Sequence, residues 1–152
     1  MKTFNTSNEL MGKIHRAMRR FFEFQMKKYD ITPPQFEVLI TLWGEDGLVL
    51  SDLGRRLSRD GPTITGIIDR MEKKNLVKRK RSNHDRRIIQ VFLTTKAQEM
   101  KDDLMKMQQD ASSDIVKNFS TDEIQLLEDL LSKLLLNVEQ KIIPIMNNGG
   151  HR

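Results

Sequence analysis

The spacing of the apolar residues changes after Asn75, and this change limits the choice of fold more than any other feature of the sequence. Before Asn75 the apolar residues recur every three or four positions, which predicts an amphipathic helix. This stripe consists of Ile64, Ile67, Ile68 and Met71. After Asn75 the period becomes two, over residues 76–81 and 88–93, on either side of the charged loop 82–87. A period of two predicts strands, so we expect a β-hairpin with a long polar tip.

Two short helices are predicted directly before the hairpin. Ser51 can cap the first helix, which carries Leu53 and Leu57 and stops at residues 58–61. Pro62 stands at a first helical position and opens the second helix. Two short helices joined by a tight, glycine-containing turn are typical of a helix-turn-helix. The chain is therefore expected to be mainly α, with a small β-hairpin wing.

A long helix and a shorter one are predicted in front of this unit. Residues 8–29 carry two apolar stripes, so this helix should be covered on more than one side. Thr32 precedes two prolines and Gln35, and it can cap the next helix through a capping box. Residues 44–47 end that helix, and residues 48–50 are a short strand candidate.

Two further helices are predicted after the hairpin. Thr95 with Gln98 and Ser120 with Glu123 can form capping boxes at their starts. These helices carry more leucine and methionine than a small winged unit can cover, which favours a dimer interface. Burial within one subunit is the alternative. The last residues, 147–152, should fray.

The composition excludes several classes of protein. The 152-residue chain contains no cysteine, which excludes disulfides, thiolate metal sites and cysteine nucleophiles. The histidines His15, His84 and His151 lie far apart, so neither a metal nor a cofactor is expected. The sequence contains no P-loop, dinucleotide-binding, zinc-protease or nucleophile-elbow motif, so we do not expect an enzyme. Neither a signal peptide nor a transmembrane helix fits, which predicts a cytoplasmic protein without a membrane partner.

Positive charge is concentrated in residues 50–96, here called the basic region. This region contains 13 Lys/Arg and 5 Asp/Glu, a net charge of +8. The whole chain carries +5, which leaves −3 for the remainder. The densest part, residues 73–87, holds eight cations and a single acid, Asp85. Such a distribution is expected of a protein that binds a polyanion. A solvated charged face is the alternative.

The second short helix presents its polar residues on one face. With the isoleucine stripe directed inward, the outward face consists of Pro62, Thr63, Thr65, Gly66, Asp69, Arg70 and Lys73. The threonines offer hydroxyl and methyl groups to base edges, Gly66 permits close approach, and Arg70 can reach phosphates. The start of the helix, residues 61–63, favours a phosphate oxygen. These features are typical of a helix that enters the major groove of DNA, and an ordinary surface helix is the alternative.

The single acid of the hairpin tip lies two residues before Arg87. An ion pair between the Asp85 carboxylate and the Arg87 guanidinium would fix the direction of this arginine. A planar, oriented arginine at the end of a hairpin suits a narrow minor groove. The alternative is that Asp85 only relieves charge repulsion or forms an Asx turn.

Together these segments resemble the MarR family of winged helix-turn-helix transcription regulators. The likeness covers nearly the whole chain, including residues 51–57 and the helix that continues into DRMEKKNLV. Its most specific part is HDRRIIQVFLTTKA, where a D-x-R wing is followed by a strand ending in Leu-Thr. One departure is Gly66, where many members carry a longer, often basic residue.

The resemblance implies a winged helix-turn-helix flanked by N- and C-terminal dimerisation helices. The expected parts are one MarR-like domain over 1–152, with 33–94 binding DNA and with 4–29 and 95–146 forming a homodimer. The helix 62–74 is then expected to read the major groove of double-stranded DNA, and Arg87, steadied by Asp85, to reach the minor groove. The residues expected at the DNA interface are Ser51, Arg59, Pro62, Thr63, Thr65, Gly66, Arg70, Lys73, Arg81, Asp85, Arg86 and Arg87.

The resemblance also implies a small-molecule effector that binds between the dimer helices and the winged unit. The candidate residues are His15, Phe22, Phe36 and Trp43. An ordinary place in the core, or a satisfied polar group, also explains each of them. The peroxide-sensing mode of some relatives requires cysteine and is excluded here.

The leading functional hypothesis is a homodimeric repressor that binds a pseudo-palindromic operator, since a two-fold dimer places two reading helices about one DNA turn apart. A non-specific nucleic-acid-binding or architectural protein, which uses the basic wing only for its charge, is the first alternative. An interaction adaptor that retains the winged fold as a scaffold is the second.

Overall fold

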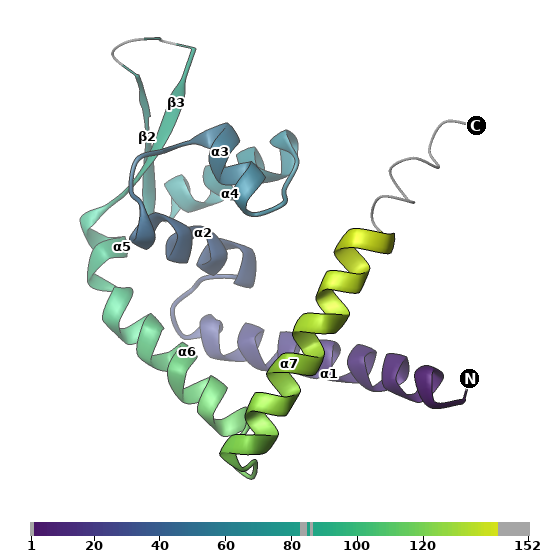
Figure 1. Ribbon diagram of the computed structural model, residues 1–152. Coiled ribbons are helices and arrows are strands. Elements are labelled where there is room, and N and C mark those ends of the chain that lie inside the picture. The colour runs from purple at the N-terminus through teal and green to yellow at the C-terminus, as the bar shows by residue number, and fades with distance from the viewer. Residues whose placement is uncertain (1, 83–84, 86, 143–152) are drawn as a thin grey trace. The chain divides into compact units, whose positions relative to one another are not determined.

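A computed structural model describes residues 2–82, 85 and 87–142 of the chain. The chain divides into two parts, residues 1–107 and 108–152. Helices dominate, and one three-stranded sheet lies in the first part (Figure 1). The predicted fold class, mainly α with a small β wing, is confirmed.

The described residues form helices and three short strands. They are α1 (Lys2–Lys27), α2 (Pro33–Gly44), β1 (Leu48–Val49), α3 (Leu50–Arg56), α4 (Gly61–Lys73), β2 (Val77–Arg81), β3 (Ile89–Leu93), α5 (Thr95–Glu99), α6 (Lys101–Ile115), α7 (Thr121–Asn137) and the π-helix η1 (Val138–Ile142). None of the helices in the described residues is both long enough and apolar enough to cross a membrane.

Helix α1 begins and ends earlier than the predicted range 8–29. The main-chain N–H groups of Tyr29 and Ile31 both donate to the Met26 carbonyl oxygen, at 3.0 and 3.3 Å. Between them Asp30 has a φ of 53°, in the left-handed region that commonly ends a helix. Residues 28–30 therefore form a turn into α2 instead of a last helical turn.

Two helix starts in the basic region differ from the prediction, by two residues at α3 and by one at α4. Helix α3 begins at Leu50 with Val49 as its N-cap, so the prediction that Ser51 caps it is wrong. The reason is that the chain passes directly from strand β1 into the helix. Helix α4 begins at Gly61 and not at Pro62, because the Asp60 side chain caps it.

Thr or Ser residues also cap α2, α5 and α7. Thr32 and Ser120 cap their helices as predicted. The Ser120 box is reciprocal, because the Ser120 N–H donates to Glu123 Oε2 at 2.8 Å and the Glu123 N–H donates to Ser120 Oγ at 3.2 Å. At α5 the hydroxyl of Thr94, and not of Thr95, accepts from the main-chain N–H three residues further on, at 3.3 Å. The prediction was wrong by one residue because β3 ends at Leu93, which leaves Thr94 as the first residue outside the strand.

The three strands form an antiparallel sheet in the order β1–β3–β2. Strands β2 and β3 pair from Val77↔Leu93 to Arg81↔Ile89, and β1 pairs with the other edge of β3 through Leu48↔Val91. The hairpin of β2 and β3, here called the wing, extends away from α3 and α4 (Figure 1). Because α3 and α4 lie between β1 and β2 in the chain, the sheet holds both ends of the helix-turn-helix.

The core of the first part confirms the inward stripe of α4. Ile64, Ile67, Ile68 and Met71 are each 4% exposed or less. They belong to a cluster with buried residues of α2, α3, the sheet and α6, among them Leu39, Leu42, Leu53, Val91 and Leu104. This packing fixes the rotation of α4, so its opposite face is directed outward.

The second part has no comparable core within the described residues. No residue of α7 is buried. Its leucines Leu126, Leu130, Leu131, Leu135 and Leu136 are between 50% and 58% exposed. An apolar helix surface of this extent is typical of a contact with another chain.

Gly47 holds the loop before β1 against the sheet. Its φ is +78°, and a Cβ at this position would lie 2.6 Å from Cε1 of Phe92. Oδ1 of Asp46 accepts from the main-chain N–H groups of Leu93, at 2.8 Å, and of Gly47, at 3.0 Å. Backbone conformation and space therefore both require glycine here.

We predict that Gly47→Ala lowers the free energy of unfolding by about 2 kcal/mol or more, because a left-handed backbone and an overpacked contact act together. Urea denaturation followed by circular dichroism measures the change. Gly44→Ala is the matched control, since a Cβ there meets nothing within 4 Å, and its effect should stay within about 0.5 kcal/mol. Equal stability of the two variants would contradict the prediction.

Candidate nucleic-acid interface

Helix α4 turns one polar face outward. Its exposed residues are Pro62, Thr63, Thr65, Asp69, Arg70 and Lys73, and Gly66 on the same face is partly exposed. Ser51, on the neighbouring helix α3, is also exposed. The packing of the isoleucine stripe leaves this face open to a partner.

A carboxylate occupies the N-terminus of α4. Asp60 Oδ1 accepts a hydrogen bond from the Thr63 main-chain N–H at 2.7 Å. Hydrogen bonds from the Thr63 hydroxyl and from this N–H hold the pKa of Asp60 below its usual range, so the carboxylate is ionised at neutral pH. A phosphate, which we expected at residues 61–63, must therefore share this helix end with an anionic cap.

Gly66 stands in the interior of α4 with room for a side chain. A Cβ at this position would lie 3.5 Å from Arg70 Nη1, an ordinary contact distance. Glycine in a helix interior costs about 0.5–1 kcal/mol relative to alanine. Among the described residues no neighbour would be displaced by a methyl group here, so packing within the chain does not account for the glycine.

The tip of the wing contains an Asx turn. Asp85 Oδ1 accepts from the Arg87 main-chain N–H at 2.9 Å, and the Asp85 carbonyl oxygen accepts from the Ile88 N–H at 2.9 Å. In the described part of the chain no ion pair joins Asp85 to Arg87. The expected ion pair is therefore wrong, and the alternative, an Asx turn, is present. The physical reason is that the short Asp85 side chain reaches a main-chain N–H two residues away without ordering a long arginine. Arg86 and His84 lie outside the described residues.

The cations of the basic region fall into two groups. The first group is paired with carboxylates: Arg55 with Asp52, Arg56 with Glu45, Arg59 with Glu37, Lys74 with Asp30, and Arg79 with Asp69 and Glu72. Within the described residues the second group has no carboxylate at ion-pair distance, and it comprises Arg70, Lys73, Lys78, Lys80, Arg81, Arg87 and Lys96. This second group lies mainly on α4 and the wing, and its charges are not paired with carboxylates of the described residues.

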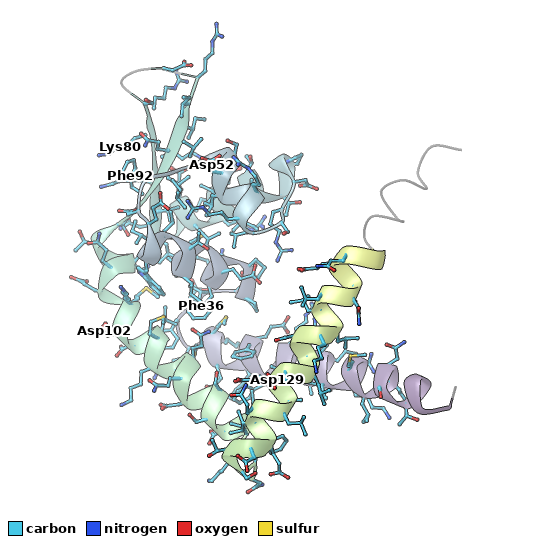
Figure 2. All side chains as sticks on the ribbon, in the orientation of Figure 1. Phe36, Asp52, Lys80, Phe92, Asp102 and Asp129 are labelled. Atoms are coloured by element: carbon cyan, nitrogen blue, oxygen red, sulfur yellow. The ribbon has the colours of Figure 1, made fainter. Side chains whose placement is uncertain are left out.

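Arg59 belongs to the paired group although it was expected to contact DNA. Its Nη2 donates to Glu37 Oε2 of α2 at 3.0 Å, and its buried Nε has no hydrogen-bond partner among the described residues. The turn between α3 and α4 is thereby fastened to α2. Figure 2 shows the side chains of this unit and of the wing.

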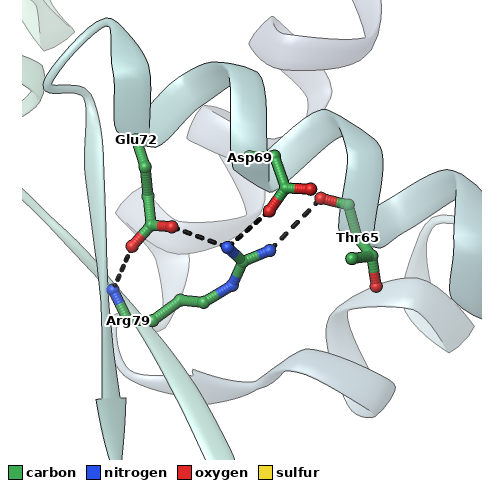
Figure 3. Close-up of polar contacts among 4 residues, drawn as sticks. All are labelled: Thr65, Asp69, Glu72 and Arg79. Carbon is green, nitrogen blue, oxygen red and sulfur yellow. Dashed lines mark hydrogen bonds and ion pairs between the residues drawn. The ribbon is translucent and has the colours of Figure 1, made fainter.

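Sequence reasoning missed Arg79, which reaches from β2 to α4. There it meets Thr65, Asp69 and Glu72 (Figure 3). A signal was available, because two acids three residues apart share one face of a helix and can hold one arginine between them. We expected all eight cations of residues 73–87 to face a polyanion, but Arg79 is directed to the protein.

The structure brings two of the four effector candidates into contact. The rings of Phe36 and Trp43 meet edge to face, with centroids 6.3 Å apart. Phe36 is 4% exposed, and Trp43 Nε1 donates to the Ala97 carbonyl oxygen at 3.1 Å. Phe22 packs against the same core from α1, and His15 lies exposed on α1, seven residues before it.

A surface depression of about 270 Å³ lies at another place in the first part. It is lined by Glu23 and Lys27 of α1, by residues 30–33 and by Lys74. None of the four effector candidates lines it. The residues proposed to bind an effector therefore do not form this depression.

Comparison with known proteins identifies the family. The model of the MarR family matches residues 31–89, from the end of the turn after α1 to the first residue of β3. The HTH-type transcriptional regulator MgrA of Staphylococcus aureus is 31% identical over 135 residues, which are 86% of this chain and 90% of that protein. A solved complex of S. aureus MepR with DNA has a TM-score of 0.78 and 25% identity, and the match covers 84% of this chain and 95% of that one. A MarR variant from E. coli in complex with operator DNA has a TM-score of 0.76 and 29% identity, covering 84% and 92% of the two chains.

These comparisons agree with the geometry of the helix-turn-helix and the wing. They also confirm the resemblance that was carried by the sequence motifs. The chain belongs to the MarR family of transcriptional regulators.

Proposed function

We propose that this protein is a homodimeric, sequence-specific DNA-binding transcription regulator that acts as a repressor. The observation that carries the proposal is that the cations without a carboxylate partner collect on α4 and the wing. An exposed helix face next to a basic hairpin is the electrostatic footprint of a DNA reader. Two similar structures, of MepR and of a MarR variant, were solved with DNA, which supports the same kind of partner here.

In this proposal α4 enters the major groove and the wing reaches the adjacent minor groove. The contacts are proposed for Ser51, Arg59, Pro62, Thr63, Thr65, Gly66, Arg70, Lys73, Arg81, Arg86 and Arg87. Asp85 shapes the tip through its bond to the Arg87 N–H. In this proposal a phosphate competes with Glu37 for the Arg59 guanidinium.

A binding selection from randomised duplex DNA at physiological salt tests the proposal. We expect a two-fold-symmetric motif that is bound about 10³-fold or more tightly than a scrambled duplex. Recovery of no motif, with affinity that collapses as salt rises, would instead indicate a non-specific nucleic-acid binder. Retained dimerisation without DNA affinity at low salt would indicate an interaction adaptor.

Arg87→Ala tests the role of the wing. We predict that it weakens binding to the selected duplex by about 1–3 kcal/mol, because one minor-groove contact is lost. Fluorescence anisotropy at fixed salt measures the affinity. Arg20→Ala removes an exposed arginine of α1, outside the basic region, and serves as the control. Equal affinity of Arg87→Ala and the parent would remove Arg87 from the interface.

Gly66→Ala separates packing within the chain from contact with DNA. Because the added methyl group has room, we predict that the free energy of unfolding rises by about 0.5–1 kcal/mol. If the DNA surface approaches α4 closely at Gly66, the same variant binds the selected duplex more weakly. Opposite signs in thermal unfolding and in DNA titration are the expected result. Unchanged or tighter binding would show that Gly66 does not face DNA.

The homodimer is proposed from the uncovered apolar residues. On α1, Leu10, Ile14 and Phe24 are 52%, 54% and 75% exposed, and the leucines of α7 are exposed to a similar degree. A second copy of the chain would cover such surfaces, as in obligate homodimers. We accordingly propose one MarR-like domain over 1–152, with 33–94 as the DNA-binding part and 4–29 with 95–146 as the dimerisation part.

Leu131→Glu tests the dimer. Leu131 is already 50% exposed, so a charge there costs little within one subunit, but it would be buried without a partner at an interface. We predict that the variant sediments as a monomer at concentrations where the parent is a dimer. Ser132→Glu adds the same charge outside the leucine stripe and should remain dimeric. A dimeric Leu131→Glu variant would contradict the assignment of α7.

We also propose that a small-molecule effector releases DNA, that the protein is cytoplasmic and that it has no enzymatic activity. Among His15, Phe22, Phe36 and Trp43, the half-buried Phe22 and Trp43 adjoin the core and still have exposed surface. Aromatic ligands would contact these two most readily. Release of the selected duplex by small aromatic acids, measured by anisotropy, tests this part.

A further inference from the structure

Arg79 differs from the neighbouring cations of the wing. Its side chain is only 21% exposed, whereas Lys78, Lys80 and Arg81 are all exposed. Figure 3 shows its guanidinium directed to α4 and not away from the protein. It therefore contributes little to the positive surface of the wing.

Four hydrogen bonds join Arg79 to α4. Its Nη1 donates to Asp69 Oδ1 and to Glu72 Oε2, both at 2.6 Å, and its Nη2 donates to the Thr65 carbonyl oxygen at 3.2 Å. Its main-chain N–H donates to Glu72 Oε1 at 2.9 Å. Glu72 thus holds both the backbone and the side chain of one strand residue. A planar guanidinium held by three acceptors has one permitted orientation, which an ammonium group would not have.

The position of Arg79 in the hairpin explains why its contacts with α4 affect the direction of the wing. Arg79 pairs in register with Val91, which is fully buried, and the next pairs toward the tip are Lys80↔Gln90 and Arg81↔Ile89. Strand β1 accompanies β3 only as far as Val49↔Gln90, so beyond that pair the hairpin has two strands, which are marginally stable by themselves in water. The direction of the wing relative to α4 therefore depends on the contacts made at its base, where Arg79 joins β2 to α4.

We propose that Arg79 is a positioning residue that holds the wing and α4 at a fixed separation, so that both grooves of one DNA site are read together. This inference rests on the proposed DNA-binding function. Arg79 itself does not touch DNA in this account, because its terminal nitrogens face two carboxylates that would repel phosphates. Losing it uncouples Arg87 at the tip from the threonines of α4.

A double-mutant cycle between Arg79 and Arg87 tests the coupling. The probe is the duplex that the parent protein selects from randomised DNA, and a scrambled duplex is the control. We expect Arg79→Met to weaken specific binding about tenfold, and Arg87→Ala to cost much less in that background than in the parent. Additive losses of affinity would overturn the proposal. If Arg79→Met has already moved the wing out of position, removing Arg87 at its tip should cost little further affinity.

Glu72→Met distinguishes the positioning role from an effect of charge alone, because the two explanations predict opposite changes in DNA affinity. It removes a negative charge beside the proposed interface, so phosphate attraction alone predicts tighter binding at low salt. The positioning role predicts weaker specific binding, because both Glu72 acceptors are lost. Arg79→Lys should lie between the parent and Arg79→Met, since it keeps the charge and loses the fork. Tighter specific binding by Glu72→Met would contradict the proposal.

A distance measurement without DNA separates this inference from the proposed function. The chain has no cysteine, so spin labels can be attached through Lys73→Cys on α4 and Ile88→Cys at the wing, with labelled protein diluted by unlabelled protein. We expect a narrow distance distribution with Arg79 and a broad one with Arg79→Met or, if that variant does not fold, with Arg79→Lys. An unchanged distribution would overturn the positioning role even if the parent binds DNA specifically. A broadened one, without any selected DNA motif, would leave the positioning role intact and contradict the proposed function.

Discussion

The pairing of β3 with both β1 and β2 is the constraint on which the DNA-binding part depends. Leu48 before the helix-turn-helix pairs with Val91 after it, and Val77 starts a second pairing on the opposite edge of the same strand. The ends of α3 and α4 are thereby brought to one sheet, and the isoleucine stripe of α4 packs into the core next to it. This packing leaves α4 only one rotation, so its threonine face has a fixed direction. Figure 1 shows α4 and the wing in the same unit of the chain.

Charge is distributed on this frame in two ways. Five cations of the basic region pair with carboxylates of the same chain. Among them, Arg59 fastens the turn after α3 to α2 and Arg79 fastens β2 to α4. Seven further cations, on α4, the wing and the start of α5, have no carboxylate partner among the described residues. The net charge of the basic region therefore overestimates the positive charge that is available to a polyanion. In physical terms, paired arginines provide geometry, and cations without an internal partner provide attraction to phosphates.

Much of this architecture was predictable from the sequence, because apolar periodicity and turn chemistry act locally. The stripe of α4, the hairpin and the caps at Thr32 and Ser120 follow from such patterns. The predicted starts of α3, α4 and α5 were wrong by one or two residues, since neighbouring groups compete for the same cap and only the path of the strand or turn selects one. The Asx turn at Asp85 was an open alternative to an ion pair, and Arg79 was missed, because each depends on where a hairpin folds back. The roles of the site residues and the dimer stay predictions, because they depend on partners outside the chain.

The most direct test of the central claim is a hydroxyl-radical footprint of the parent protein on its selected duplex. If α4 and the wing read adjacent grooves and the protein is a dimer, protection is expected in minor-groove segments placed symmetrically about the centre of the site. Between them should lie two major-groove segments whose centres are separated by about one helical turn of 10–10.5 base pairs, or a multiple of it. A single unsymmetrical patch, or uniform weak protection along the duplex, would contradict the account.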